Sequence, residues 1–320
     1  MLRRTVVALG LWSAAHGALG CAAKTDEGDK FREALPATSD VNLSVPRSGD
    51  ATSAQTLAIG SSDGTSGYAK FYTFTRNVTD GVDFVTGAIL GTLWLVVHTH
   101  PTTIDEHQAT WGPGSGDALS PVVWRLTVKE VGNAVFDFEL DGRPKASTSE
   151  TDYLAVLTGR GYGKSHPLHR DGFFLVDNDA ARQLDPDRAH DHGTTKITYQ
   201  LHAWPATLAV EIRPTPAPDW LDITVTHQQD GSGAVDIDAL TDVEPVVKDG
   251  NLEDIVMHSR WANTGAGRAD VQISGGDVST LVKATECWST SFFRSYYTDS
   301  AGLEPTVGDP SACVFADAQF

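Results

Sequence analysis

The fold is decided by residues 122–142, which read VVWRLTVKEVGNAVFDFELDG. Apolar side chains fill every second position on both sides of Gly132-Asn133, and polar side chains fill most positions between them. Because neighbouring side chains of a strand point to opposite faces, this period of two predicts two strands with one apolar face each. Gly132-Asn133 predicts the hairpin turn between them, and Asp141-Gly142 predicts the next turn. The alternating apolar residues are Val122, Trp124, Leu126, Val128, Phe136, Phe138 and Leu140.

The same alternation recurs along most of the chain after residue 106. The later segments are 154–157, 173–176, 197–201, 208–212, 221–225, 235–237, 255–261, 271–273 and 281–297, the last with a break. No β-α-β order and no internal repeat is evident, which argues against a dinucleotide-binding fold. The fold class is therefore predicted to be mainly β. We expect a broad antiparallel meander, built as a curved half-barrel, a closed barrel or a two-sheet sandwich.

One segment has a helical period. Apolar residues between about 79 and 99 fall at helical spacing and also fill the other faces, while Thr79 or Asp80 can cap the start. A helix that is apolar all round lies in a protein core or in a membrane. Its length and the charge of Asp83 argue against a membrane span. We predict one buried helix at about 79–99 that packs on the sheet and ends before Pro101.

The N-terminal residues 1–21 read MLRRTVVALGLWSAAHGALGC. A short basic region, an apolar stretch and small residues before Cys21 are typical of a secretory signal peptide. The last four residues resemble the lipobox of bacterial lipoproteins. In that family Cys21 would carry a diacylglyceryl thioether, with fatty-acyl groups such as palmitate, and become the mature N-terminus. The family prefers Leu where this chain has Ala18, and Ala18-x-Gly20 also suits ordinary signal peptidase cleavage, which would release a periplasmic or secreted protein.

The lipoprotein resemblance implies a location and a partner. It implies that the N-terminal lipid anchors the chain to a membrane of the cell envelope. By the same analogy, Ala22 in place of Asp favours the outer membrane of a Gram-negative bacterium over the inner membrane.

Cysteine counting gives a prediction about Cys287 and Cys313. The chain has 3 Cys, so one is left over in an oxidising compartment. If Cys21 is acylated, Cys287 and Cys313 remain as an even pair, and a disulfide between them is expected. The alternative is two separate buried thiols.

The composition predicts four parts along the chain. We expect a signal peptide at 1–20, a flexible Ser-, Thr- and Asp-rich tether at 21–67, a β-rich domain at 68–299 and a C-terminal tail at 300–320. The disulfide would hold this tail to the domain.

The charge of the chain argues against two kinds of partner. Residues 1–20 contain two arginines and no acid, so the remainder carries 22 basic and 42 acidic residues. A net charge of −20 argues against sequence-independent binding to nucleic acid and to anionic lipid surfaces, because both need a basic surface.

Histidine pairs are the candidates for metal chemistry. His98 and His100 form one His-x-His pair, and His190 and His192 form another beside several Asp residues. On a strand, residues i and i+2 face the same way, so such a pair can bind zinc or another divalent ion. The opposing interpretation is that these are exposed polar residues. No catalytic residue is assigned, because no nucleophile elbow, P-loop or His-Glu-x-x-His motif is present.

The expected function follows from the architecture. One helix lying against a long curved meander resembles the half-barrel of Lol-type lipid-handling lipoproteins, in the order of elements over about 68–297. We expect an exported lipoprotein without enzymatic activity or cofactor, which binds a hydrophobic, lipid-like ligand or has a structural or interaction role in the envelope. The alternative is a metal-binding protein or metal-dependent hydrolase that uses the His pairs.

Overall fold

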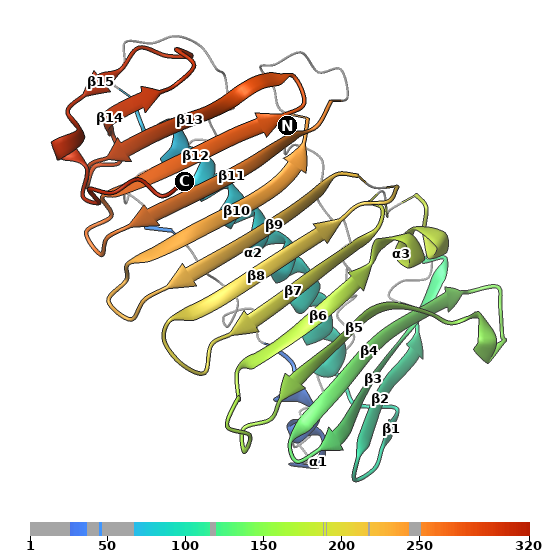
Figure 1. Cartoon of the computed structure of the whole chain (residues 1–320). Helices are drawn as coiled ribbons and strands as arrows, with labels where there is room; N and C mark the ends of the chain where they lie inside the picture. Colours follow the sequence, from blue (N-terminus) through green and yellow to red (C-terminus); the bar gives the residue numbers. More distant parts are fainter. Residues whose placement is uncertain are drawn as a thin grey trace.

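The chain folds around a single open antiparallel sheet. The computed structural model describes residues 26–36, 45–46, 67–115, 120–187, 189, 191–216, 218–242 and 251–320. Its 15 strands follow one another across the sheet in sequence order (Figure 1). The predicted mainly β meander is therefore confirmed, in the form of an open curved sheet. The strands are β1 (Thr103–Ile104), β2 (Gln108–Gly114), β3 (Val122–Gly132), β4 (Val135–Pro144), β5 (Leu154–Tyr162), β6 (Asp171–Asp177), β7 (Thr194–Gln200), β8 (Ala206–Arg213), β9 (Trp220–His227), β10 (Gly233–Thr241), β11 (Glu253–Trp261), β12 (Gly267–Gly275), β13 (Val278–Trp288), β14 (Arg294–Asp299) and β15 (Val307–Gly308).

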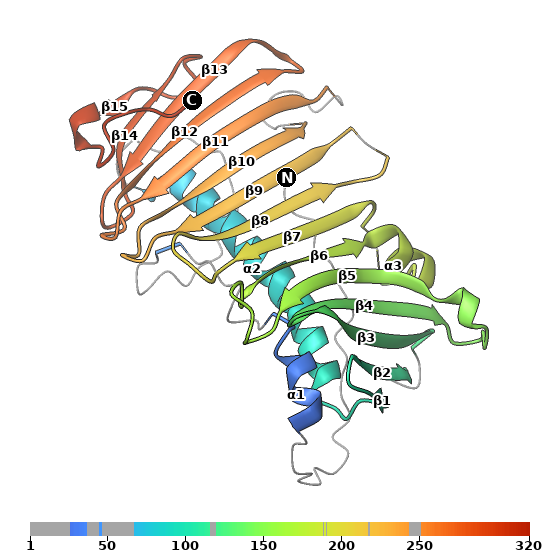
Figure 2. The same cartoon turned by 60° about the horizontal axis from the view of Figure 1, so that its bottom comes forward.

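Within the described residues, three α-helices accompany the sheet. They are α1 (Asp26–Arg32), α2 (Lys70–Val97) and α3 (Asn178–Leu184). Helix α2 crosses the concave side of the sheet diagonally, from β13 at one end to β1 and β2 at the other (Figures 1 and 2). With 28 residues it is about 42 Å long at 1.5 Å per residue. Among the described residues, no helix combines the length and the apolar character that a membrane crossing requires.

The core lies between α2 and the concave face of the sheet. The inward side chains of the strands are almost completely buried, and their alternation with outward polar residues is the period of two seen in the sequence. Burial of this apolar surface is the main force that holds helix and sheet together. The largest fully buried side chains on the strands are Trp111, Leu126, Phe136, Phe138, Phe174, Tyr199, Trp261 and Trp288.

Glycines opposite aromatic residues shape this concave face. In five strand pairs, an aromatic side chain stands directly across from a glycine of the neighbouring strand, and the ring lies over the space that a Cβ would fill. At Gly159, for example, a Cβ would come within 2.3 Å of the ring of Phe138. The pairs are Trp124 with Gly142, Phe138 with Gly159, Tyr199 with Gly172, Trp261 with Gly233 and Trp288 with Gly267.

Two of these pairs reveal a repeated unit that sequence inspection missed. Residues 231–238 and 265–272 share the pattern Gly-x-Gly-x-x-Asp followed by an aliphatic residue. In both, the first glycine has φ +88° in a hairpin turn. Its carbonyl accepts a hydrogen bond from a buried indole, at 3.2 Å from Trp261 Nε1 and at 2.9 Å from Trp288 Nε1. The tryptophans follow at different distances along the chain, so the unit has no fixed period in the sequence.

The start of α2 differs from the predicted one. The helix begins at Lys70 and ends at Val97, so Thr79 and Asp80 lie inside it rather than at its cap. Asp80 pairs with Arg76 at 3.5 Å, and the hydroxyl of Thr79 donates to the carbonyl of Arg76 at 2.9 Å. The helix extends further because its first turn is capped by a side chain from a distant part of the chain, on β13.

One predicted turn is part of a strand, and another is shifted. Asp141-Gly142 lies within β4, since Arg125 on β3 directly faces Asp141 and binds its carboxylate at 2.6 Å. Gly112–Gly114 forms the end of β2, with a shift of register against β3. The hairpin after β3 turns at Asn133-Ala134, one residue later than expected.

The segment expected to be a flexible tether contains a docked helix. Within residues 21–67, α1 packs against β2 and β3. Phe31 is fully buried, with its ring in edge contact with Phe136 at 5.8 Å, and Val45 is also buried. The folded unit therefore includes residues 26–36 and does not begin at 68. Residues 1–25, which contain the predicted signal peptide and Cys21, lie outside the described residues.

Candidate functional site

Helix α2 is capped at its first turn by a buried carboxylate from β13. The helix has no acidic residue in its first turn. Instead Glu286, which is fully buried, accepts hydrogen bonds from the backbone N–H of Lys70, at 3.0 Å, and from that of Phe71. A negative charge at this position complements the positive end of the helix dipole.

The charge of Glu286 is balanced by a small ion-pair network. Arg294 donates through Nε to Glu286 at 2.5 Å and binds the more exposed Glu304 at 2.7 Å, while Lys70 also binds Glu304 at 2.7 Å. Burial raises the pKa of Glu286, and the guanidinium of Arg294 with the two helix amides offsets part of that rise. Burial acts to raise the pKa of Glu304 as well. The hydrogen bonds from Lys70 and Arg294 outweigh this effect and hold the pKa below its usual range. The network therefore ties the start of α2 to β13 and to the loop that carries Glu304.

The last turn of α2 is capped by α1. The helix has no basic residue in its last turn. Arg32 donates through Nε to the carbonyl of Val97 at 2.6 Å and through Nη2 to that of Thr99 at 3.3 Å. It also pairs with Asp29 at 3.0 Å. A cation here complements the negative end of the dipole, so α1 is tied to α2 by charge as well as by Phe31.

The C-terminal tail covers a patch of charged residues on the convex face. Cys313 in the tail and Cys287 on β13 form a disulfide, with Sγ atoms 2.04 Å apart, as cysteine counting predicted. Beyond it, Arg268 donates to the carbonyls of Phe315 and Ala316, at 3.1 and 2.9 Å. Asp270, completely buried, binds Arg268 and accepts from the backbone N–H of Gln319 at 3.0 Å. The tail therefore satisfies charges that the sheet alone would leave exposed.

The predicted metal-binding histidines do not converge in the part of the chain that the structure describes. His98 and His100 are exposed in the segment that follows α2. His190 lies outside the described residues, and His192 lies 3.3 Å from Asp179. Among the described residues, no three His, Cys, Asp or Glu side chains are grouped so that they could hold a metal ion.

Two further histidines are oriented by aspartates. His202 Nδ1 lies 2.6 Å from Asp171, and His258 Nδ1 lies 2.7 Å from Asp236. Asp171 also accepts from the backbone N–H groups of Leu201 and His202, so it joins β6 to the turn after β7. Neither ring is hydrogen-bonded to a serine or cysteine within the described residues, so neither completes a nucleophilic triad there. The partners are 31 and 22 residues apart along the chain, so no local sequence pattern indicated these pairs.

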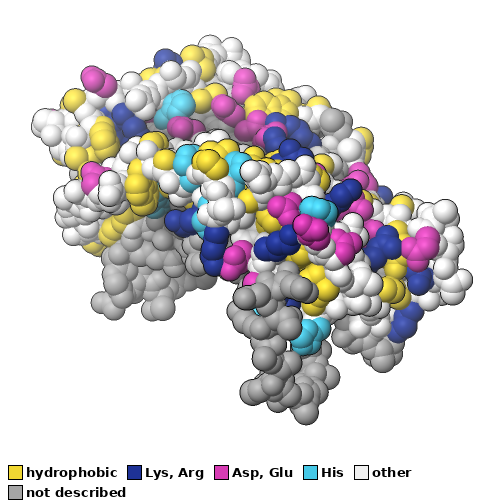
Figure 3. Space-filling model, turned by 90° about the horizontal axis from the view of Figure 1, so that it is seen from below, with side chains coloured by type: hydrophobic (Ala, Val, Ile, Leu, Met, Phe, Trp, Pro, Cys, Tyr) yellow, Lys and Arg dark blue, Asp and Glu magenta, His cyan; other side chains and the backbone are white. Residues whose placement is uncertain are grey.

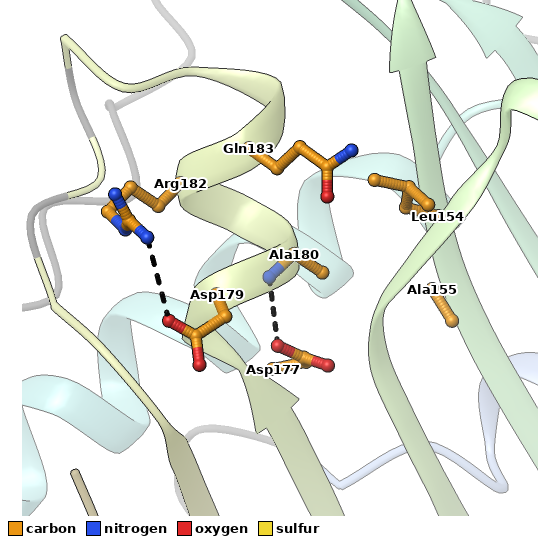
Figure 4. Close-up of a pocket in the computed structure, with 7 residues that line it drawn as sticks. All are labelled: Leu154, Ala155, Asp177, Asp179, Ala180, Arg182 and Gln183. Atoms are coloured by element: carbon orange, nitrogen blue, oxygen red, sulfur yellow. Dashed lines mark hydrogen bonds and ion pairs between the residues drawn. The ribbon is translucent and has the colours of Figure 1, made fainter. Parts of the chain in front are cut away.

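One open depression lies beside α3 (Figure 4). Its charged side chains are already engaged: Asp177 caps α3 by accepting from the N–H of Ala180 at 2.8 Å, and Asp179 lies 3.9 Å from Arg182. The hydroxyl of Thr215 and then other donors hold the pKa of Asp179 below its usual range. None of the described residues that line it is a serine, cysteine or histidine, so its chemistry is that of a polar surface. Its remaining lining residues are Leu154, Ala155 and Gln183.

The comparisons with known proteins identify no relative. No protein-family model, no curated protein and no solved structure matches this chain. A function for this chain therefore has to be inferred from its own fold and side chains.

Proposed function

We propose that this chain is an exported lipoprotein, acylated at Cys21, whose sheet has a structural or interaction role in the cell envelope and no enzymatic role. One observation carries the proposal. The disulfide pairs Cys287 with Cys313, so the odd cysteine is the one that directly follows a signal-like segment. Disulfides persist in oxidising compartments such as the periplasm, which agrees with export. The outer membrane is the proposed location.

The concave face supports a structural role over the carriage of a hydrophobic ligand. The inward side chains of the central strands, such as Phe174, Ile197 and Leu208, are completely buried. A ready-made cavity with room for solvent beside them would leave part of their surface accessible. Helix α2 lies along this concave face (Figures 1 and 2).

The convex face supports the same proposal. Oppositely charged side chains face one another on neighbouring strands there, such as Arg160 and Asp137 at 2.6 Å, and Lys196 and Glu211 at 2.6 Å. Such cross-strand pairs keep a wide sheet surface soluble and specify its register. A surface of this kind suits contact with polar partners.

Metabolic labelling with palmitate in a Gram-negative host tests the acylation. The wild-type chain should incorporate label and float with membranes, and Cys21→Ser should do neither. Cys313→Ser is the matched control, because it also removes one cysteine but should leave labelling intact. Absence of label in the wild type, with cleavage after Gly20 and a soluble product, would overturn the proposal.

Native mass spectrometry of the chain from Lys24 onward, expressed in a periplasm without a tag, tests the non-enzymatic structural role. The mass expected is that of the polypeptide with one disulfide. An excess of several hundred daltons that disappears on denaturation would instead establish a lipid-like ligand. An excess of tens of daltons, removed by a chelator, would establish the zinc or other divalent metal of the alternative hypothesis.

A further inference from the structure

We infer that the end of the sheet that carries α1 faces the bilayer, so that the lipid headgroups are the partner of this surface. The inference rests on the proposed acylation of Cys21 and adds an orientation to it. It also replaces the picture of a domain on a long tether with that of a domain held close to the membrane by one end.

The distance along the chain from the anchor to the fold is short. Cys21 and Asp26, the first residue of α1, are five residues apart. Even a fully extended chain spans at most about 3.6 Å per residue, so the start of α1 lies within about 18 Å of the anchored cysteine. A free tether of residues 21–67 would instead allow an average reach of roughly 40 Å in any direction.

The end to which this short connection leads is rigidly attached. Phe31 is buried against Phe136, Lys30 binds Glu130 at 2.8 Å, and Arg32 caps α2. These three contacts join α1 to a strand hairpin and to the long helix, so α1 cannot leave the sheet without exposing a large aromatic side chain. The anchor therefore restrains the whole sheet and not only α1.

The charges at this end allow it to approach headgroups. The chain as a whole is strongly acidic, yet two carboxylates here are paired with lysines, Glu130 with Lys30 and Glu33 with Lys164, while Asp105 and Glu106 are exposed between β1 and β2. Three exposed histidines, His98, His100 and His107, lie on the segments between α2 and β2. Seen from below, basic, acidic and histidine side chains are intermixed (Figure 3). Such a mixed surface is repelled less by an anionic bilayer than the rest of the chain.

The opposite end of the sheet is distant. The first turn of α2 packs near β13, and the helix spans about 42 Å between the two ends. With the α1 end at the bilayer, the C-terminal tail and the disulfide point away from it. Ile104 on β1 and Leu281 on β13 are exposed aliphatic residues at the two ends, so they offer matched labelling positions.

Headgroup quenching tests this orientation. The acylated full-length protein is reconstituted into vesicles of phosphatidylethanolamine and phosphatidylglycerol that contain a lipid with a nitroxide on its headgroup. Ile104→Cys or Leu281→Cys is labelled with a fluorescent maleimide; the disulfide and the thioether leave the added thiol as the reactive one. The Ile104 label should lose most of its fluorescence and the Leu281 label almost none. Equal quenching, or stronger quenching at Leu281, would overturn the inference.

Two controls separate this inference from the proposed function. Flotation with the vesicles reports acylation: a chain that does not float fails the proposed function, whereas a chain that floats with equal quenching fails the orientation alone. Inserting a Gly-Ser segment of about 20 residues between Ala23 and Lys24 adds roughly 25 Å of average reach and should restore most of the fluorescence at Ile104. Quenching unchanged by that insertion would mean that the surface binds headgroups by itself.

Discussion

The two ends of α2 are capped in the same way but in different surroundings. Both lack a local charge that complements the helix dipole, and both receive one from a distant part of the chain. Glu286 reaches the first turn from 216 residues away, inside the core, with Arg294 as its counterion. Arg32 reaches the last turn from 65 residues away, at a partly exposed position. Glu286 and Arg32 each carry one unit of charge, so the two caps differ in how far water can reach them.

This difference predicts unequal contributions to stability. A buried ion pair leaves an uncompensated charge when one partner is removed, and water cannot replace the lost hydrogen bonds. At the partly exposed end, water can bind the freed carbonyls, so the same kind of loss costs less. The cap near β13 should therefore contribute more to the stability of the fold than the cap at the α1 end.

Substitution of the buried cap should have the largest effect. Glu286→Gln removes the carboxylate that binds the amides of Lys70 and Phe71 and leaves Arg294 without its buried partner. We expect a loss of about 4 kcal/mol in the free energy of unfolding, measured by urea denaturation. Glu304→Gln is the matched control, since Glu304 binds the same Arg294 from a more exposed position, and it should lose less than about 1 kcal/mol. Equal losses in the two variants would contradict the comparison.

Removal of the disulfide beside this cap should come next. Cys313→Ser opens a loop of 26 residues and frees the tail from Arg268 and Asp270. Loop entropy alone predicts a loss of about 3.5 kcal/mol. A reductant should destabilise the wild type by a similar amount and leave the variant unchanged. If reduction has no effect on the wild-type denaturation midpoint, the disulfide does not contribute to the stability of this end.

Substitution of the exposed cap should have a smaller effect. Arg32→Met keeps the length of the side chain but removes its hydrogen bonds to Val97 and Thr99, for an expected loss of about 1 kcal/mol. Hydrogen exchange should increase in α1 and the last turn of α2, with the first turn unaffected. Arg76→Met, which breaks only the pair with Asp80 inside α2, serves as the control and should cost a few tenths of a kcal/mol. A loss for Arg32→Met as large as that for Glu286→Gln would remove the distinction between the two ends.

The smallest effect concerns pH at the loop that carries Glu304. Although burial acts to raise its pKa, Asp299 accepts from the N–H groups of Leu303, Glu304 and Ala301, and these hold the pKa of Asp299 below its usual range. A lowered folded-state pKa stabilises the fold above the unfolded value of about 3.9, and this stabilisation is lost as the pH falls through the folded-state pKa. The protection of these three amides from hydrogen exchange should therefore decrease as the pH is lowered from about 5, while the disulfide stays intact.

Asp299→Asn provides the control for that titration. Its loop amides should be less protected at about pH 5, and their protection should not change further through the acid range. A titration that persists in the variant would assign the pH dependence to another group, such as Glu304.

The strands could be predicted because their signal is local. The alternation over 122–142 predicted β3 and β4 with the correct inward residues, since burial of one face needs no information from elsewhere. The turn at Asp141-Gly142 was wrong because Arg125, on the facing strand, stabilises an aspartate inside a strand. The start of α2 was misplaced for a related reason: its capping carboxylate belongs to β13, so no capping residue precedes Lys70.

The candidate sites were less predictable than the strands. The disulfide followed from counting, which needs no geometry. The pairs of His202 with Asp171 and His258 with Asp236 depend on which residues face each other across strands and turns, and that register is not readable from either segment alone. The histidines at 98 and 100 are close in sequence, but closeness along the chain does not supply further ligands.

By itself, the sequence determined the alternation that makes the sheet, the cysteine parity that predicts the disulfide, and the signal-like start that underlies the proposed acylation. These come from short-range patterns and from composition. The tertiary structure alone decided the extent of α2, the glycine and aromatic pairs that shape the concave face, and the docking of α1. Each of these depends on groups that are far apart in the chain, and folding brings them together because the buried apolar face of every strand must be covered.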